Sequence, residues 1–259
     1  MTNALALWRK EMRTYFTSPI AYAVMVVFLL LSGYFFYGIL SSFVEFAMRA
    51  AFQAQYYRMP VPTLNVNEMA IRPLFQNLSV IFIFLLPMIT MRLFAEEKRS
   101  GTIELLYTSP ITLTQIILGK YLAALALFTV MILLTMIHQS FFFIFGNPEL
   151  GPVLTAYLGI FLLGASFLSL GLLISTLTEN QIIAAVVGFG LFLLLWAIGW
   201  LAHFAGPGLR GILSYLSIFE HFDDFAKGVI DTRDVIFYLS FTFFGLYLTY
   251  RSLESTRWR

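Results

Sequence analysis

The chain has 259 residues, of which 59% are hydrophobic and 12% are charged, with 28 Phe, a formal net charge of +2 and no Cys. Its mean hydropathy of +0.83 and its uncharged apolar runs of about 20 residues are typical of an integral membrane protein. The small net charge argues against nucleic acid binding, which needs a concentrated basic face. Without Cys the chain has no disulfide, no thiolate zinc site and no Cys nucleophile.

The N-terminal stretch predicts an amphipathic helix within residues 5–16 that lies along the membrane surface. Its apolar residues recur at helical spacing and its basic residues fall opposite them. The apolar set is Leu5, Trp8, Met12, Tyr15 and Phe16, and the basic set is Arg9, Lys10 and Arg13. A full-length apolar span follows with no small-residue cleavage site, so this stretch does not read as a cleavable signal peptide.

Six apolar gaps between charged residues predict six membrane-spanning helices, because an unpaired charge at the centre of the bilayer is costly. They cover residues of about 20–40, 73–91, 121–145, 154–176, 181–204 and 235–250. Together they predict an all-α integral membrane protein with a single transmembrane domain over residues 1–259. The sixth gap is the weakest, since its roughly 16 residues reach only about 24 Å across a hydrocarbon core of about 30 Å.

The distribution of Lys and Arg predicts the orientation of these spans. Ten of the 16 basic residues fall on the side that holds both termini and the segment between the second and third spans. The positive-inside rule therefore places that side in the cytoplasm. Residues 41–72 and 205–234 are then outside.

The stretch from Phe94 to Thr112 concentrates charge between two apolar spans. After Ser100 and Gly101, three apolar residues share one face of a short helix, with Glu104 in its first turn and Pro110 just beyond it. These apolar residues are Ile103, Leu106 and Tyr107. The pattern predicts a short amphipathic helix on the cytoplasmic side. It is interpreted either as a solvated loop whose charges set topology or as a docking site for a soluble partner.

The segment 205–234 is too apolar for a free loop. Its apolar residues recur at intervals of three or four, which predicts short helices that rest on or dip into the outer leaflet. These residues are Ile212, Leu216, Phe219, Phe222 and Phe225.

Enzyme chemistry has weak support in this sequence. The candidate histidines and carboxylates, which form no H-E-x-x-H pair, are His138, His203 and His221 with Asp223 and Asp224. No G-x-S-x-G turn is present. A phosphate-binding loop fails because Tyr121 follows Gly119-Lys120. We therefore expect a non-catalytic chain, with ATP bound elsewhere.

Three stretches carry a family resemblance. Residues 96–111, EEKRSGTIELLYTSPI, look like the coupling-helix signature of ABC type-2 transporter permeases. Residues 10–22 are similar to the N-terminal elbow helix and first-span entry of that family. Residues 221–234, HFDDFAKGVIDTRD, resemble the outer segment before the last span in its gliding-motility-associated branch, to which the nitrous-oxide-reductase maturation permeases are related.

The resemblance implies two functional segments. The first docks a partner ATPase through Glu96, Glu97, Lys98, Gly101, Ile103, Glu104, Leu105, Leu106 and Tyr107. The second is a re-entrant outer gate between spans five and six with the motif residues His221, Phe222, Asp223, Gly228, Asp231, Arg233 and Asp234. The family more often has Leu at positions 103 and 107, which leaves the apolar face of the docking helix intact.

The resemblance also implies the assembly. ATP and Mg would bind to two copies of a separate ATPase, and this chain would bind no cofactor or metal itself. A second permease chain would complete the pore, with a homodimer expected and a heterodimer left open, and a membrane-anchored auxiliary protein would belong to the gliding-type branch. The implied role, in a bacterial inner membrane, is to couple ATP hydrolysis to export or mechanical work. An intramembrane enzyme and a non-transporting scaffold or sensor are the alternatives.

Overall fold

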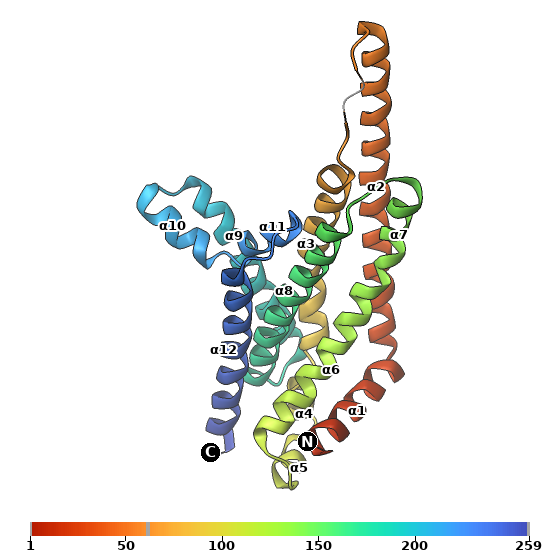
Figure 1. The fold of residues 1–259 in the computed structure, drawn as a ribbon. Helices are drawn as coiled ribbons and strands as arrows, with labels where there is room; N and C mark the ends of the chain where they lie inside the picture. The colour runs from red at the N-terminus through yellow and green to blue at the C-terminus, as the bar shows by residue number, and fades with distance from the viewer. Residues whose placement is uncertain (1, 61–62, 258–259) are drawn as a thin grey trace.

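A computed structural model describes residues 2–60 and 63–257, and all regular structure in these residues is helical (Figure 1). The long helices are α2 (Pro19–Tyr57), α3 (Arg72–Thr90), α6 (Leu113–Leu134), α8 (Leu150–Leu177), α9 (Gln181–Phe204) and α12 (Thr232–Arg257). The shorter ones are α1 (Thr2–Thr17), the π-helical turn η1 (Asn67–Ile71), α4 (Ala95–Arg99), α5 (Ile103–Thr108), α7 (Met136–Phe145), α10 (Pro207–Leu216) and α11 (Glu220–Ala226).

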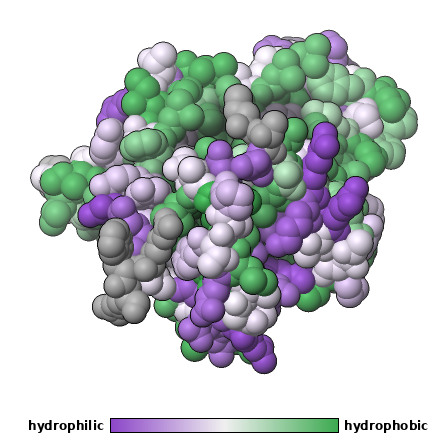
Figure 2. Space-filling view, turned by 90° about the horizontal axis from the view of Figure 1, so that it is seen from below, coloured by the Kyte–Doolittle hydropathy of each residue, from purple (hydrophilic) through white to green (hydrophobic). Residues whose placement is uncertain are grey.

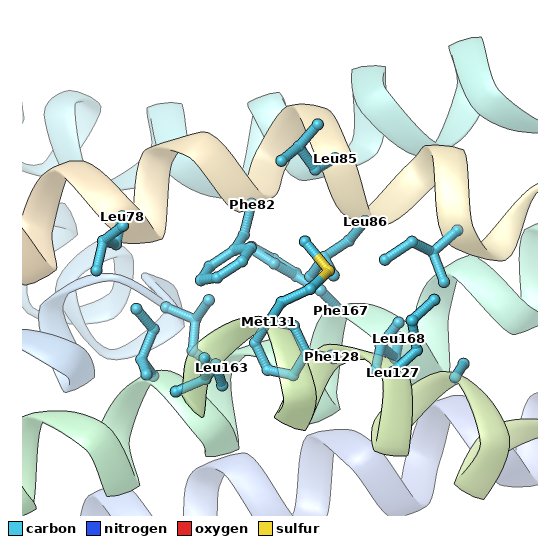
Figure 3. Packing of buried hydrophobic residues seen from close by; sticks show 14 of the residues in the cluster. Leu78, Phe82, Leu85, Leu86, Leu127, Phe128, Met131, Leu163, Phe167 and Leu168 are labelled. Carbon is cyan, nitrogen blue, oxygen red and sulfur yellow. The ribbon is translucent and has the colours of Figure 1, made fainter. Parts of the chain in front are cut away.

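Helix α8 is the centre of the bundle and packs against α3, α6, α9, α11 and α12. Aromatic and aliphatic side chains of α3, α6 and α8 meet in the core shown in Figure 3. The rings of Phe82 and Phe128 lie 4.7 Å apart, and those of Phe167 and Phe192 are stacked at 4.4 Å. Stacked and edge-to-face rings at these separations add to the stabilisation that comes from burial alone.

Two glycines let helices approach α8 closely. A Cβ atom at Gly164 would lie 2.1 Å from the ring of Phe128 on α6, and one at Gly171 would lie 2.3 Å from Thr90 Oγ1 on α3. Small residues at helix contacts are the usual means by which membrane helices approach one another. The close packing of α3, α6 and α8 therefore depends on these glycines.

The bundle has two distinct ends. Helix α1 begins, α12 ends, and α4 and α5 lie at one end, which we call the α5 end (Figure 1). At the opposite end, which we call the α11 end, α11 lies over the bundle, the α9–α10 pair extends to one side and α2 rises beyond the other helices (Figure 1).

The helix that contains the first predicted span, 20–40, is longer than the span itself. Helix α2 runs 39 residues to Tyr57, about 58 Å at the usual rise of an α-helix. Glu45, which was used to end the span, pairs with Arg49 one turn later on the same exposed face, so the charge does not stop the helix. The helix ends at Arg58, which adopts a left-handed conformation with φ of 53°.

The third predicted span, 121–145, has the wrong start and is not continuous. Helix α6 begins at Leu113, where Thr112 and Gln115 form a capping box, and the helical run is interrupted at Thr135 before α7. Lys120, which was taken as the boundary of the span, lies inside α6 and is only 1% exposed.

Five helical runs of the described residues are long and apolar enough to cross a membrane. They correspond to the first five predicted spans and cover Pro19–Tyr57, Asn67–Arg99, Leu113–Phe145, Leu150–Leu177 and Gln181–Ala202. The predicted sixth span, 235–250, lies in α12, which is 26 residues long but is not among these five. Its charged ends and its Ser, Thr and Tyr residues lower its hydropathy.

The N-terminal helix forms as predicted, and a neighbouring face of it is buried in the bundle. Leu7, Glu11 and Tyr15 are buried, and α1 packs against α6. Leu5 and Phe16, which were expected to share the apolar face, are exposed. Leu7, Glu11 and Tyr15 are spaced four residues apart and therefore form one stripe of α1, which faces the bundle and has the Glu11 carboxylate at its centre.

The segment 205–234 forms two short helices, α10 and α11, as the periodicity predicts. Phe222 and Phe225 are buried in the bundle, whereas Ile212 and Leu216 of α10 are exposed. The apolar residues of this segment thus divide between a part inserted into the fold and a part left on its surface.

Candidate functional site

The predicted docking segment lies at the α5 end and consists of α4 and α5. Seen from this end in Figure 2, hydrophilic residues extend from the middle of the face to its lower edge, and hydrophobic residues lie mainly in the upper part and at the sides. A cavity of about 380 Å³ opens here between α1, α4, α5 and α6. The segment is therefore a surface feature that is fixed to the bundle on one side.

Helix α4 is attached to α8 by hydrogen bonds. The backbone N–H groups of Phe94 and Ala95 donate to Ser175 Oγ at 2.9 and 3.0 Å, and this hydroxyl donates to the carbonyl of Met91 at 3.2 Å. Lys98 Nζ donates to the carbonyl of Thr176 at 2.6 Å. Two of the N–H groups at the start of α4, which have no partner within the helix, are thereby satisfied by the central helix of the bundle.

A buried charge cluster joins α1, α4 and α6. Lys120 Nζ of α6 lies 2.9 Å from Glu11 Oε1 of α1 and 2.9 Å from Glu97 Oε1 of α4. The ammonium also lies 5.2 Å from the centre of the Phe94 ring, within reach of a cation–π interaction. Lys10 approaches Glu97 to 3.6 Å from the exposed side. One buried cation therefore fixes three elements that are far apart in the sequence.

Arg92 connects the end of α3 to α2 and α4. Its guanidinium donates two hydrogen bonds of 3.1 Å to Ser18 Oγ, the N-cap residue of α2. Its Nε lies 3.5 Å from Glu96 Oε2. Through Arg92, a displacement of α4 would therefore also act on the start of α2.

The apolar face predicted for α5 is turned toward the protein. Ile103 and Leu106 are half-buried and pack against the core, and Tyr107 is half-buried as well. Leu105, in contrast, is 69% exposed, and Glu104 beside it is exposed. Leu105 is thus the apolar residue of α5 that is free to contact another molecule.

The remaining residues of the docking prediction differ in exposure. Glu97 is nearly buried and Glu96 is about half-exposed. Gly101 is exposed and has a φ of 70°, a left-handed conformation that glycine adopts without strain and that turns the chain between α4 and α5. The segment combines an inner side that contacts the bundle with an outer side available to solvent.

The seven predicted gate residues lie at the α11 end, and several of them contact each other. His221 Nδ1 lies 2.6 Å from Asp234 Oδ1, and its Nε2 lies 2.9 Å from the carbonyl of Tyr215. Both groups are buried. This pair attaches α11 to the first turn of α12.

The other gate residues have structural roles at the same end. Phe222 is buried, and Asp223 pairs with Arg72 of α3 at 2.6 Å. Gly228 has a φ of 96° and lies against Pro152. The carboxylate of Asp231 accepts from the N–H of Arg233 at 2.8 Å, and the Arg233 guanidinium lies 4.9 Å from the ring centre of Tyr215.

The candidate metal ligands do not converge. Within residues 2–60 and 63–257, no three His, Asp or Glu side chains are close enough together to hold a metal ion. His138 stacks on Phe36 with ring centres 5.2 Å apart. The side chain of His203 lies outside the described residues.

Three residues that shape the docking segment were missed in the sequence. Ser175 lies in an apolar helix, Glu11 lies among basic residues, and Lys120 directly precedes the predicted third span. A charge buried within an apolar run was the available signal, because such a charge almost always has a partner. Which partner it has depends on the tertiary fold.

Comparison with known families gives an assignment. Residues 5–246 match the ABC-2 family transporter protein family. The chain belongs to the ABC-2 transporter family. No curated protein matches the sequence. As an ABC-2 protein with several apolar helices of spanning length, it is a multi-pass transmembrane permease of the ABC transporter class.

Proposed function

We propose that this ABC-2 protein is the permease subunit of a transporter powered by a separate ATPase that docks on α4 and α5. The observation that carries the proposal is the combination of an exposed Leu105 with a buried Glu11–Lys120–Glu97 cluster that lines the same cavity. A partner bound at Leu105 would push on α4, and the cluster would pass this displacement to α1 and α6. Such a coupling requires different contacts in the two states of the transporter.

The proposal also covers the rest of the transporter. ATP and Mg would be held by two ATPase subunits, and α12 would be the sixth span. Helices α2 and α9 expose long apolar faces, which supports pairing with a second permease chain, expected to be a copy of this one. The gliding-motility-associated branch and a membrane-anchored auxiliary protein remain expectations that rest on residues 221–234. The direction of work, export or mechanical, is part of the proposal as well.

The docking test uses two leucines of similar exposure at opposite ends. Leu105 is 69% exposed on α5 and Leu150 is 62% exposed at the start of α8. Interface energy is usually concentrated in a few apolar anchors worth about 2 kcal/mol or more, so Leu105→Asp should abolish retention of the ATPase subunit and its stimulated turnover. Leu150→Asp should leave both unchanged.

The readout is vanadate-sensitive ATP hydrolysis by complexes purified through a tag on the permease from the native host. Equal activity in the Leu105→Asp and wild-type complexes would reject α5 as the docking element. Leu106→Asp is a less informative variant than Leu105→Asp, because Leu106 packs against the core and its replacement also disturbs folding.

The orientation of the chain in the membrane is tested separately by labelling single cysteines. This is possible because the chain has no native Cys. Single cysteines at the exposed positions Ser100 and Ser255 of the α5 end should react only with maleimides that cross the membrane. A cysteine at Pro60, beyond the end of α2, should react from outside. Labelling of Ser100→Cys by an impermeant reagent in intact cells would place the α5 end outside and remove the ATPase proposal.

A further inference from the structure

A cavity of about 650 Å³ lies at the α11 end between the α9–α10 pair on one side and α3 and α11 on the other. Its volume is within the range of sites that bind small molecules. Helix α9 lines it with aromatic residues, and α10 and α11 line it with charged residues. The cavity is distinct from the docking segment, which lies at the opposite end of the bundle.

Two tryptophans form the aromatic wall. The rings of Trp196 and Trp200 lie one turn apart on α9 with centres separated by 4.5 Å, and Trp200 is 60% exposed. Tryptophan faces attract cations, including quaternary ammonium groups, and Trp is enriched where a membrane meets water. This wall therefore suits a cationic group attached to an apolar body.

The acidic groups of the cavity are not equivalent. Asp223 forms ion pairs with Arg72 at 2.6 Å and with Lys227 at 2.8 Å, and Asp224 forms one with Lys227 at 3.0 Å. Glu220, which is half-buried, accepts a hydrogen bond only from the neutral hydroxyl of Ser214, at 3.2 Å. Within residues 2–60 and 63–257 no cation pairs with it.

The basic groups differ in the same way. Lys227 is occupied by its two aspartates. Arg210 is exposed and has no acceptor in the part of the chain that the structure describes, although it lines the same cavity as Glu220. One carboxylate and one guanidinium without charged partners thus face a common space beside a tryptophan pair.

We propose that this cavity binds the zwitterionic headgroup of a membrane amphiphile. The ammonium group lies between the Glu220 carboxylate and the rings of Trp196 and Trp200, and the phosphate group contacts Arg210. The acyl chain leaves along the exposed apolar surface of α10, which includes Leu209. An anionic amphiphile without an ammonium group would leave Glu220 unpaired and is bound more weakly. The inference does not depend on the ATPase proposal.

The test compares two probes that differ in the headgroup cation. The purified full chain in a maltoside detergent is titrated with a long-chain monoacyl phosphocholine or with the matching monoacyl phosphoglycerol, and bound ligand is counted by native mass spectrometry. We expect the phosphocholine to bind at least about tenfold more tightly, because only it supplies the cation for the carboxylate and the tryptophans. Free phosphocholine without an acyl chain should bind more weakly than the amphiphile.

Variants connect this preference to the cavity. Glu220→Gln keeps the size of the side chain and Trp200→Ala removes an exposed ring, so both should fold and both should lose the preference for phosphocholine. Glu45→Gln and Tyr56→Ala, at exposed positions of α2 far along the chain from the cavity, should keep it. Equal binding of the two headgroups by the wild-type chain, an unchanged preference in Glu220→Gln, or free phosphocholine binding as tightly as the amphiphile would overturn the proposal.

Discussion

At the α5 end the side chain of Lys120 is 1% exposed and lies 2.9 Å from both Glu11 and Glu97, whereas at the α11 end Lys227 is 43% exposed beside Asp223 and Asp224. Lys120 joins helices that are distant in the sequence, whereas Lys227 pairs with carboxylates one turn away, of which Asp223 also pairs with Arg72 of α3. The two groups also differ in contact with water. An exposed ion pair contributes about 0–1 kcal/mol, while removal of one partner from a buried pair costs about 3–5 kcal/mol.

The ends also differ in what holds them. The α11 end is fixed by close helix contact and by the buried His221–Asp234 pair. A Cβ atom at Gly159 of α8 would lie 2.5 Å from Phe225 of α11, and the hydroxyl of Thr155 donates to the carbonyl of Phe225 at 2.9 Å. The α5 end is fixed by buried charge and by Ser175. Under the docking proposal, we expect a displacement of α4 to be passed to α1 and α6 through these buried charges.

The largest effect is expected for Lys120→Ala. It leaves two carboxylates buried without their cation, so it should lower the free energy of unfolding by about 3–5 kcal/mol. Lys227→Ala removes an exposed cation and should cost less than about 1 kcal/mol. Thermal unfolding of both variants in the same detergent measures the difference.

A compensated variant distinguishes charge from packing. Lys120→Met combined with Glu11→Gln and Glu97→Gln removes all three charges and should recover most of the lost stability, because buried ion pairs can be replaced by neutral groups of similar volume. Equal destabilisation by Lys120→Ala and Lys227→Ala would contradict the contrast between the two ends.

The second effect tests whether close contact holds the α11 end. Gly159→Ala places a methyl group against Phe225 and should destabilise by about 1–3 kcal/mol, the usual cost of overpacking. Gly151→Ala, on the same helix with no atom within 4 Å of the added Cβ, should be neutral or slightly stabilising. If both variants unfold at the same temperature, the steric account of this end is wrong.

The comparison also explains what the sequence could predict. Apolar runs between charges identify helices of spanning length because bilayer thickness and charge desolvation act locally, and α3 and α9 begin and end within a residue of the expected spans. The same reasoning failed at Glu45 and Lys120, where a charge is tolerated because another residue pairs with it. Periodicity located α5 and its apolar face, but such a pattern does not show which neighbour covers that face.

The third effect concerns the hydrogen bonds of Ser175. Ser175→Ala leaves the N–H groups of Phe94 and Ala95 without their acceptor and should cost on the order of 1 kcal/mol per lost bond. Ser140→Ala is the matched control, because Ser140 is exposed and donates only within its own helix. We expect Ser175→Ala to loosen α4 specifically, which hydrogen exchange at residues 94–99 would detect. Unchanged exchange there would show that α4 is held by its charges alone.

The smallest effect is the pH dependence of the α11 end. Burial acts to raise the pKa of Asp223, but the hydrogen bonds and charges of Lys227 and Arg72 outweigh it and hold the pKa below its usual value. A lowered pKa in the folded state means that the carboxylate stabilises the fold above its unfolded pKa of about 3.9 and loses this contribution as the pH falls through the folded value.

Asp223→Asn should therefore unfold at a slightly lower temperature than the wild type at pH 5–7, and the gap should close below about pH 4. All other titratable groups are the same in both proteins, so their effects cancel in the difference. Glu45→Gln, which breaks an exposed pair within one helix, sets the scale for a carboxylate that joins no separate elements. A gap between Asp223→Asn and wild type that stays the same size as the pH is lowered from 5 through the folded pKa of Asp223 would mean that the carboxyl acts through hydrogen-bond geometry and not through its charge. The α11 end would then depend on charge even less than its exposure indicates.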